Sequence, residues 1–258
     1  MNTIKRAALA APVLTLAAML AMAAPAAAAD GSAQAKLAPV VLNGVQGSGT
    51  AMATVKGTTL TVTMSATGLL ADSPHAAHIH FGAEARHECP VAADDTTPDV
   101  GKINTTDGAP AYGGIVVSLT KTGDTSPASG LAVDRFDTAP GGNLTYERGS
   151  IEVSPEVATA IVAGQSVVVI HGVDHNANGT YDGDTKSDLD PALPTEATDP
   201  ALCGVLAASQ MSMPAGGVAT GSGSTTGIEN AGLITAGGIA LLAGAGLAAR
   251  RRFTTTNR

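Results

Sequence analysis

Aromatic residues are scarce in this chain of 258 residues. They make up 2% of it, as three tyrosines, three phenylalanines and no tryptophan. A core built around large rings is thereby excluded, and any folded domain must be filled by Val, Ile, Leu, Ala and Met. Histidine and cysteine are also scarce, with six and two residues. They fall in a few short segments, which makes those segments the first candidates for chemistry.

Basic side chains are few as well. Residues 30–229 hold eight Lys and Arg against 22 Asp and Glu. Such a surface repels polyphosphates, so nucleic acid is excluded as an expected partner. The motifs of several common enzyme classes are missing too, because there is no nucleophile elbow, P-loop or G-x-G-x-x-G in the chain. The sequence therefore gives no catalytic residue.

The first 29 residues have the organisation of a secretory signal peptide. Lys5 and Arg6 precede the apolar run AALAAPVLTLAAMLAMAA, and Ala27 and Ala29 form an A-x-A cleavage site. A transmembrane helix is the alternative, but the apolar run is short and ends in that cleavage site. We expect an exported protein whose mature chain begins at Asp30.

The other end of the chain carries a second apolar segment. Residues 231–249 are 19 uncharged residues followed by three arginines, which suits one bilayer crossing with the basic side in the cytoplasm. We expect a single-pass protein of the cell membrane with its ectodomain outside, facing an extracellular protein or cell-wall partner. The expected divisions are a signal peptide (1–29), a β domain (30–210), a Gly/Ser/Thr-rich stalk (211–229), and a transmembrane helix with a basic cytoplasmic tail (230–258).

Alternation of apolar and polar residues predicts strands through much of residues 30–210. It is clearest at 59–70, where Leu60, Val62 and Met64 share one face. Only 154–165 is typical of a helix, with Ser154 as its N-cap. The pattern predicts an all-β fold, an antiparallel Greek-key sandwich or barrel with one short helix and long loops. Further strands are expected at 49–57, 75–81, 113–120, 149–154, 166–172 and 203–208, and the long loops at 82–112 and 172–201.

The two cysteines are Cys89 and Cys203. In an exported domain the surroundings are oxidising, so a disulfide between the only two cysteines is the expected state.

The histidines suggest a metal site. His78 and His80 alternate on one expected strand, so their side chains project from the same face, and His171 ends another strand. Three imidazoles from two strands can converge on one ion, and imidazole suits copper or zinc. His75, His87 and His175 are near enough in sequence to add a fourth ligand. The alternative is a set of exposed polar residues without a metal.

These histidine- and cysteine-containing segments resemble two protein families. The order of these segments is similar to that in the Cu,Zn superoxide dismutases: HIH, then Cys89, then VVVIHG, an acidic loop and LCGVL. That resemblance implies copper ligands at His78, His80 and His171 and a disulfide between Cys89 and Cys203. Two segments also resemble the CHRD domain of chordin-like proteins, namely ATGLLADSPHAAHIH and PEVATAIVAGQSVVVIHG. We therefore identify the chain as a member of an exported CHRD-type group. The usual CHRD ending GEIRGQ is replaced here by ALCGVL.

The chain departs from the dismutases at the residues that carry their activity. The segment after Cys89 has no bridging histidine, the zinc-binding histidines are missing, and Pro200 stands where the resemblance would place an arginine. Seven acidic side chains and one lysine lie between Asp174 and Asp199, a charge that opposes an anionic substrate. We expect a binding or structural role. The alternative is a copper protein on a dismutase-like scaffold, with redox or weak dismutase activity.

Two acidic loops are candidates for calcium. In the first, oxygen-bearing side chains alternate before Gly179, as in the front half of an EF-hand loop, although Thr185 stands where the bidentate glutamate belongs. The second resembles a dockerin-type loop with one inserted residue. Solvated acidic turns are the alternative for both. The candidate ligands are Asp174, Asn176, Asn178 and Asp182 in the first loop, and Asp95, Asp99 and Asp107 in the second.

Overall fold

The computed structural model describes residues 30–96 and 101–209. The expected signal peptide, the stalk and the C-terminal transmembrane helix all lie outside these residues. Within the described part of the chain, no helix combines the length and the apolar character that a membrane crossing requires.

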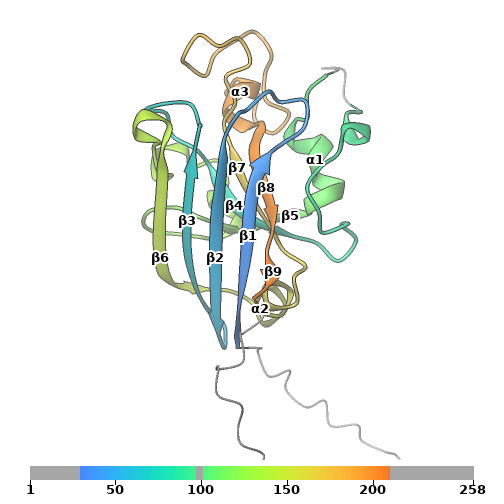
Figure 1. Ribbon diagram of the computed structural model, residues 1–258, viewed down its shortest axis with the longest axis vertical. Helices are drawn as coiled ribbons and strands as arrows, with labels where there is room; N and C mark the ends of the chain where they lie inside the picture. Colours follow the sequence, from blue (N-terminus) through green and yellow to red (C-terminus); the bar gives the residue numbers. More distant parts are fainter. Residues whose placement is uncertain (1–29, 97–100, 210–258) are drawn as a thin grey trace, which may run out of the picture. The chain divides into compact units, whose positions relative to one another are not determined.

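Antiparallel strands dominate the fold (Figure 1). They form one nine-stranded sheet in the order β5-β4-β7-β8-β1-β2-β3-β6. The ninth strand, β9, pairs with β1 near the beginning of that strand. The sheet is curled, so that its two halves pack against each other across one core. The strands are β1 (Gly31–Pro39), β2 (Ser48–Lys56), β3 (Thr59–Thr67), β4 (Ala77–Phe81), β5 (Gly114–Ser118), β6 (Leu144–Glu152), β7 (Val167–His171), β8 (Pro200–Val205) and β9 (Ala207–Ala208).

Small aliphatic side chains fill the space inside the curl. Alternate residues of β1, β2 and β3 point inward and are buried, and Ile79 and Ile170 meet them from the opposite half. The expected face of Leu60, Val62 and Met64 is among these residues, so that prediction is confirmed. The low aromatic content has the expected consequence, because Tyr146 is the only ring in this core cluster.

Within residues 30–96 and 101–209, three α-helices accompany the sheet: α1 (Thr105–Tyr112), α2 (Pro155–Val162) and α3 (Thr195–Thr198). Figure 1 shows α2 at one end of the curl, α3 at the other end, and α1 beside β5 and β8. The expected helix is α2, and its N-cap is confirmed because the Ser154 hydroxyl accepts a hydrogen bond from the Val157 N–H at 3.2 Å. Short 3-10 turns occupy Ala92–Asp94, Pro127–Ser129, Val133–Arg135 and Pro140–Gly142.

The expectation of one helix was wrong, since α1 and α3 lie inside segments read as loops. The α1 sequence TTDGAPAY contains a glycine and a proline, which both weaken a helix. It forms because Asn104 and Asp107 cap its first turn reciprocally and because Tyr112 is buried against the sheet. Neither contribution appears in the apolar periodicity.

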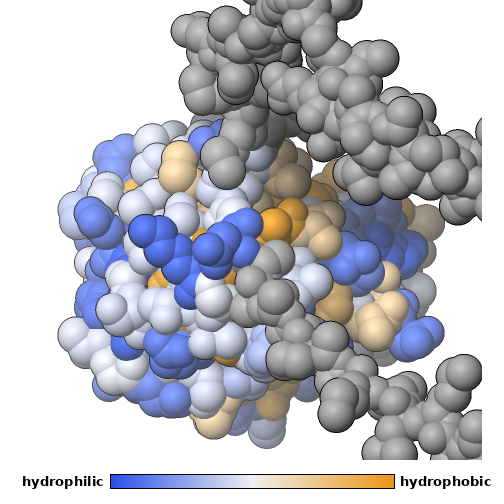
Figure 2. Space-filling view, turned by 90° about the horizontal axis from the view of Figure 1, so that it is seen from below, coloured by the Kyte–Doolittle hydropathy of each residue, from blue (hydrophilic) through white to orange (hydrophobic). Residues whose placement is uncertain are grey.

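The outward faces of the two halves of the sheet differ. We call β1, β2, β3 and β6 the open half, because their outward residues are mostly exposed Thr, Ser and charged side chains. We call β4, β5, β7 and β8 the covered half, because the long loops and α1 lie over its outward face. There Ile103 and Tyr112 pack on Val167 and Val169. From below, Figure 2 shows hydrophilic and neutral residues predominating, with small apolar patches between them.

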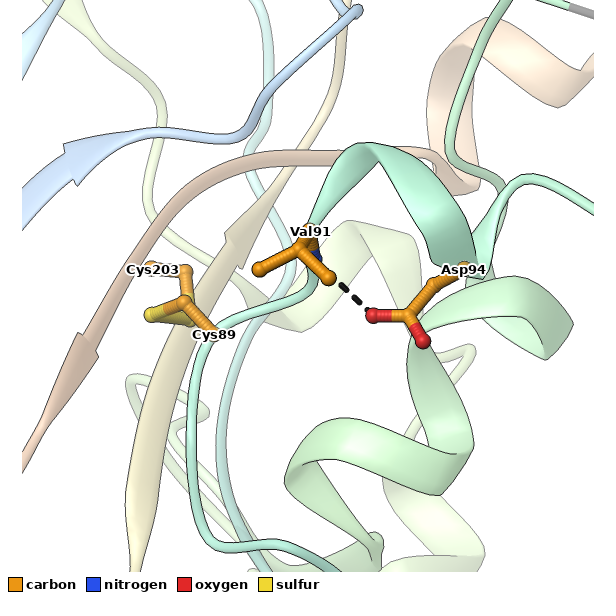
Figure 3. Close-up of a disulfide and its surroundings, with 4 residues drawn as sticks. All are labelled: Cys89, Val91, Asp94 and Cys203. Atoms are coloured by element: carbon orange, nitrogen blue, oxygen red, sulfur yellow. Dashed lines mark hydrogen bonds between the residues drawn. A yellow bond between two sulfur atoms is a disulfide. The ribbon is translucent and has the colours of Figure 1, made fainter.

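The disulfide fastens one covering loop to the covered half. Cys89 and Cys203 are bonded, with 5.8 Å between their Cα atoms and a sequence separation of 114, so the prediction is confirmed. Figure 3 shows Cys89 in the loop beside Cys203 of β8, just before the turn that Asp94 closes by accepting a hydrogen bond from the Val91 N–H at 2.9 Å. This bond holds the segment between β4 and α1 against the sheet.

Candidate metal centre

The pairing of β4 with β7 brings three histidines together on the covered half. His78 lies opposite Val169 and His80 opposite Val167, so both side chains project outward with those valines. His171 ends β7 on the same face. One ring nitrogen from each histidine lies within 4.8 Å of the other two, and the three residues are at most 3% exposed. The predicted convergence of His78, His80 and His171 is confirmed.

Backbone carbonyls fix the orientation of each ring. His78 donates from Nε2 to the Gly130 carbonyl at 3.0 Å, and His80 donates from Nδ1 to the Gly113 carbonyl at 3.0 Å. His171 donates from Nδ1 to the Thr198 carbonyl at 2.6 Å. A carbonyl can only accept, so the proton of each neutral ring is on the nitrogen that faces it. The lone pair is then left on the other nitrogen.

Those other nitrogens are buried without partners. Nδ1 of His78, Nε2 of His80 and Nε2 of His171 form no hydrogen bond to any described residue. A buried polar atom without a partner costs free energy, and here three such atoms belong to rings that each bring one nitrogen within 4.8 Å of the others. The arrangement has the features of a metal site before its ion enters: lone pairs turned inward and a hydrogen bond behind each ring.

Burial also keeps the three rings uncharged. It lowers the pKa of His80 to about 3, with a further contribution from the positive charge that His171 would carry. It lowers the pKa of His171 to about 4, against the opposing effects of the hydrogen bond to Thr198 and of Asp188. The pKa of His78 is lowered well below its usual range, first by burial and then by its two histidine neighbours. Neutral imidazole is the form that binds metal.

Aromatic rings close two sides of the cluster. The His80 ring lies 4.5 Å from that of Tyr112 between centroids, and the His78 ring lies 5.3 Å from that of Phe136. Both aromatic residues are fully buried. The three-histidine group contains no carboxylate or thiol among the described residues, so its donor set is entirely neutral nitrogen. Such a set suits copper or zinc better than calcium or magnesium.

His75 is near this cluster but does not join it. Its Nδ1 lies 2.8 Å from the His171 carbonyl and its Nε2 lies 3.1 Å from the Leu70 carbonyl, so both nitrogens face the backbone. The Tyr181 hydroxyl also contacts this ring. Gly172 leaves room for the arrangement, since a Cβ there would lie 2.1 Å from the Tyr181 hydroxyl oxygen. His75 therefore positions the backbone that carries His171.

The other two candidate ligands also lie apart from the three-histidine group. His87 bonds through Nε2 to the Gly82 carbonyl at 2.8 Å and stacks on Phe81. His175 pairs through Nε2 with Asp199 at 2.7 Å. The Asp199 carboxylate is fully buried, and burial raises its pKa although the hydrogen bonds from His175 and Thr195 oppose the rise. These two histidines therefore hold loops in place.

The first acidic loop is closed by its own side chains. Asp174 accepts hydrogen bonds from the N–H groups of Asn178 and Gly179, at 3.2 and 2.8 Å. The side-chain amides of Asn176 and Asn178 each donate to the Asp182 carboxylate at 2.8 Å. The four predicted calcium ligands are thus neighbours. Two of them present their amide nitrogens inward, and these would have to rotate to offer oxygens. Calcium binding here stays a prediction.

In the second acidic loop, two of the three predicted ligands bond to the protein itself. Asp107 is buried and accepts hydrogen bonds from Thr96 and from the Asn104 N–H, so it stabilises the start of α1. Asp95 accepts from the Gly101 N–H at 2.7 Å. Asp99 lies outside the described residues. Asp107 thus belongs to the capped start of α1 and Asp95 closes the turn at Gly101, and a calcium site there stays a prediction.

Several positioning residues were not found by sequence reasoning. Asn43 is buried and fastens the Ile103 backbone to β8, donating to the carbonyls of Ile103 and Pro200 at 2.8 Å each. Thr105 donates its hydroxyl proton at 2.7 Å to the Thr198 carbonyl that also receives the His171 proton. A lone asparagine or threonine in a predicted loop gives no signal of such a role, because its partners lie 60 to 157 residues away.

Comparison with known proteins gives no family for this chain: no protein-family model matches the sequence, and no curated protein matches it.

Proposed function

We propose that this protein is an exported, cell-surface copper-binding module of the CHRD type that holds one Cu(I) ion at His78, His80 and His171. The observation that carries this proposal is the set of three buried imidazole nitrogens. One ring nitrogen of each histidine lies within 4.8 Å of the others, and each ring has one nitrogen without a partner among the described residues and the other facing a backbone carbonyl. Three nitrogens bound to one ion at about 2.0–2.1 Å must come somewhat closer together than this, so small ring rotations complete the site.

The surroundings favour copper in its lower charge state. Transfer of an ion into a dry site costs more the higher its charge, and this site offers three neutral ligands with no carboxylate among them to act as a counter-charge in contact with the ion. A three-histidine zinc site normally keeps a water molecule as its fourth ligand, and that water needs polar partners. Tyr112 and Phe136 provide an apolar wall instead. Monovalent copper needs neither the water nor the counter-charge.

A binding role fits this chain better than superoxide dismutation. The three free nitrogens are buried, whereas a dismutase must admit an anion and solvent to its metal. Pro200, at the position where the resemblance would place an arginine, is buried in β8, and the neighbouring loop is acidic. We expect the copper-loaded protein to dismutate superoxide far below the diffusion ceiling of about 10⁸–10⁹ M⁻¹s⁻¹. A rate near that ceiling in a stopped-flow assay would favour the redox enzyme on a dismutase-like scaffold.

Metal analysis with matched variants tests the site. The purified protein is loaded anaerobically with Cu(I) in the presence of a colorimetric chelator that competes for the ion. We expect one copper per chain in the wild type and its loss in His80→Ala and in His171→Ala. His87→Ala is the control, because it removes an imidazole that lies outside the cluster. Equal retention in all four proteins, or none in the wild type, would overturn the proposal.

A further inference from the structure

The C-terminal end of α1 holds His80. The carbonyl that receives the His80 proton belongs to Gly113, the residue that ends the helix. Gly113 has a φ of 87°, and a Cβ there would overlap the backbone of Phe81, so this position requires glycine. Tyr112, the last residue of α1, places its ring 4.5 Å from that of His80 between centroids. The end of α1 thus contacts the His80 ring both through a hydrogen bond and through an aromatic side chain.

The N-terminal end of α1 is linked to His171 through α3. Thr198 ends α3, and its carbonyl oxygen accepts the His171 proton at 2.6 Å. Thr105, the first residue of α1, donates its hydroxyl proton to the same oxygen at 2.7 Å. A carbonyl oxygen has two lone pairs, and the two donors use both. The acceptor that orients His171 is therefore held in place by α1.

The Tyr112 hydroxyl joins the two ends of the helix. It donates to the Thr105 carbonyl at 2.9 Å, and both residues are buried. Gly108 lies between them in the sequence, and a Cβ there would overlap the Tyr112 ring. The absence of a side chain at Gly108 lets the ring lie back along the helix. Contacts therefore run without a break from the His80 ring to the carbonyl that holds His171.

His78 is oriented by a different part of the chain. Its carbonyl partner is Gly130, which lies in the connection between β5 and β6. α1 itself has only eight residues, and a helix this short is marginal in water without tertiary contacts. Order in α1 thus depends on its contacts with the rest of the domain. The orientation of two of the three histidines depends in turn on α1.

Resting on the proposed copper site, we propose that α1 is the positioning element of that site and that copper binding and the ordering of α1 are coupled. Thr105 and Tyr112 are the positioning residues, because they act through the partners and neighbours of the histidines. An ion that needs all three imidazoles favours the state in which α1 is in place. Coupling of this kind is reciprocal, so copper stabilises α1 as much as an ordered α1 stabilises bound copper.

Two variants of Thr105 test the inference. Thr105→Val keeps the branched shape of the side chain and removes the hydroxyl, whereas Thr105→Ser keeps the hydroxyl. We expect the Cu(I) affinity, measured against the competing chelator, to fall about tenfold in Thr105→Val. That is the lower end of the range for loss of a group that orients a metal-bound histidine. Thr105→Ser should bind copper nearly as well as the wild type.

A tyrosine pair covers the case in which Thr105→Val does not fold. Tyr112→Phe removes the hydroxyl that joins the ends of α1, and the Cu(I) affinity should fall several-fold. Tyr146→Phe is the matched control. Tyr146 is a buried tyrosine whose hydroxyl also donates to a backbone carbonyl, that of Thr120, but it lies in β6 of the open half. This variant should keep the wild-type affinity.

Hydrogen exchange and proton NMR separate positioning from a general loss of stability. Loading the wild type with Cu(I) should slow amide exchange in α1 and at 195–198 several-fold, and leave β2 and β3 unchanged. In copper-free Thr105→Val the Nδ1–H proton resonance of His171 should move, because its acceptor has lost a second donor. The Nε2–H resonance of His78 should stay in place, since Gly130 receives that proton.

Three results would overturn the inference. They are wild-type affinity in both Thr105→Val and Tyr112→Phe, an equal loss of affinity in Tyr146→Phe, and copper loading that slows exchange uniformly along the domain. Absence of copper from the wild type would instead overturn the proposed function, which metal analysis detects first. The His171 resonance, measured without copper, would then still decide whether Thr105 positions that ring.

Discussion

The open and covered halves of the sheet follow the same strand rule and reach opposite results. In the open half the outward residues of β3 are Thr61, Thr63 and Ser65, which are exposed. In the covered half the outward residues of β4 are His78 and His80, which are buried. Alternation along the strands is the same in both. The difference lies in the connections, which are a short turn between β2 and β3 and long loops around β4 and β7.

Burial of histidine has a cost that burial of aliphatic side chains lacks. The covered half leaves three imidazole nitrogens without partners, whereas the inward face of the open half consists almost entirely of aliphatic residues. Buried polar atoms without partners are expected mainly where they serve a binding or catalytic site. The covering loops, rather than the strands, therefore make this domain chemically distinctive.

The largest effect is expected from releasing a covering loop. Replacing both Cys89 and Cys203 by Ala should lower the free energy of unfolding by about 2–5 kcal/mol. Hydrogen exchange should rise chiefly between β4 and α1, and β2 and β3 should exchange as before until global unfolding. Urea denaturation and peptide-resolved exchange measure both quantities. A uniform rise along the chain would show that the two halves do not differ in this way.

Lowering the pH should destabilise the protein through the buried histidines of the covered half. The folded-state pKa of His80 is about 3 and that of His171 about 4, while unfolded histidines titrate near 6.5. The unfolded state therefore binds more protons below about pH 6.5, and stability present above that pH is lost as pH falls. For the copper-free protein we expect a decrease of up to about 1.4 kcal/mol per pH unit for each such histidine. Urea denaturation of the wild type and of His80→Gln at pH 7.5 and 5.5 checks the slope, which must be smaller in the variant.

A smaller effect is expected from calcium at the first acidic loop. Millimolar calcium should bind weakly, at about 10⁻⁴–10⁻³ M, and produce heat in a calorimetric titration of the wild type. Asp174→Ala should abolish that heat, because it removes the carboxylate around which the loop closes. Asp134→Ala, an exposed carboxylate on another loop, is the control. Titrations without heat in all three proteins would remove this loop from the candidate sites.

The smallest effect is expected in the open half. Thr63→Val replaces an exposed hydroxyl on β3 by a methyl group and keeps a β-branched side chain, so stability should change by no more than about 0.5 kcal/mol. Copper binding should be unchanged. Thermal unfolding and metal analysis check both expectations. A loss of copper in this variant would mean that the halves are coupled more tightly than their contacts indicate.

The sequence predicted the parts of the site that depend on short-range pattern. Alternation placed His78 and His80 on one face, and the scarcity of cysteine left one possible disulfide. It did not predict β1, whose GSAQAKLAP contains mostly small residues and gives a weak alternation. It did not predict α1, whose stability depends on capping and on burial of Tyr112.

The orientation of the three rings was also beyond prediction. The carbonyl behind His78 comes from Gly130, 52 residues away, and the one behind His171 comes from Thr198. These partners lie in loops whose course is set by tertiary contacts. The same loops separate His75, His87 and His175 from the cluster, although their sequence positions made them equally plausible ligands. The alternation in the sequence identifies which side chains share a face of a strand. The course of the loops determines which of those side chains come into contact.

The position of β8 in the sheet has a consequence for the order in which the domain assembles. β8 is the last long strand of the domain, yet it lies between β7 and β1 and is the only strand that joins them. While the chain emerges from its N-terminus, β1, β2, β3 and β6 can pair with one another, and β4, β5 and β7 can do the same. No strand pairing joins the two groups until residues 200–205 arrive. Cys203 arrives with that strand, so the loop carrying Cys89 is fastened in the same step. The domain is thus completed from its C-terminal end, and a chain that stops before β8 would hold two half-sheets that no strand pairing joins.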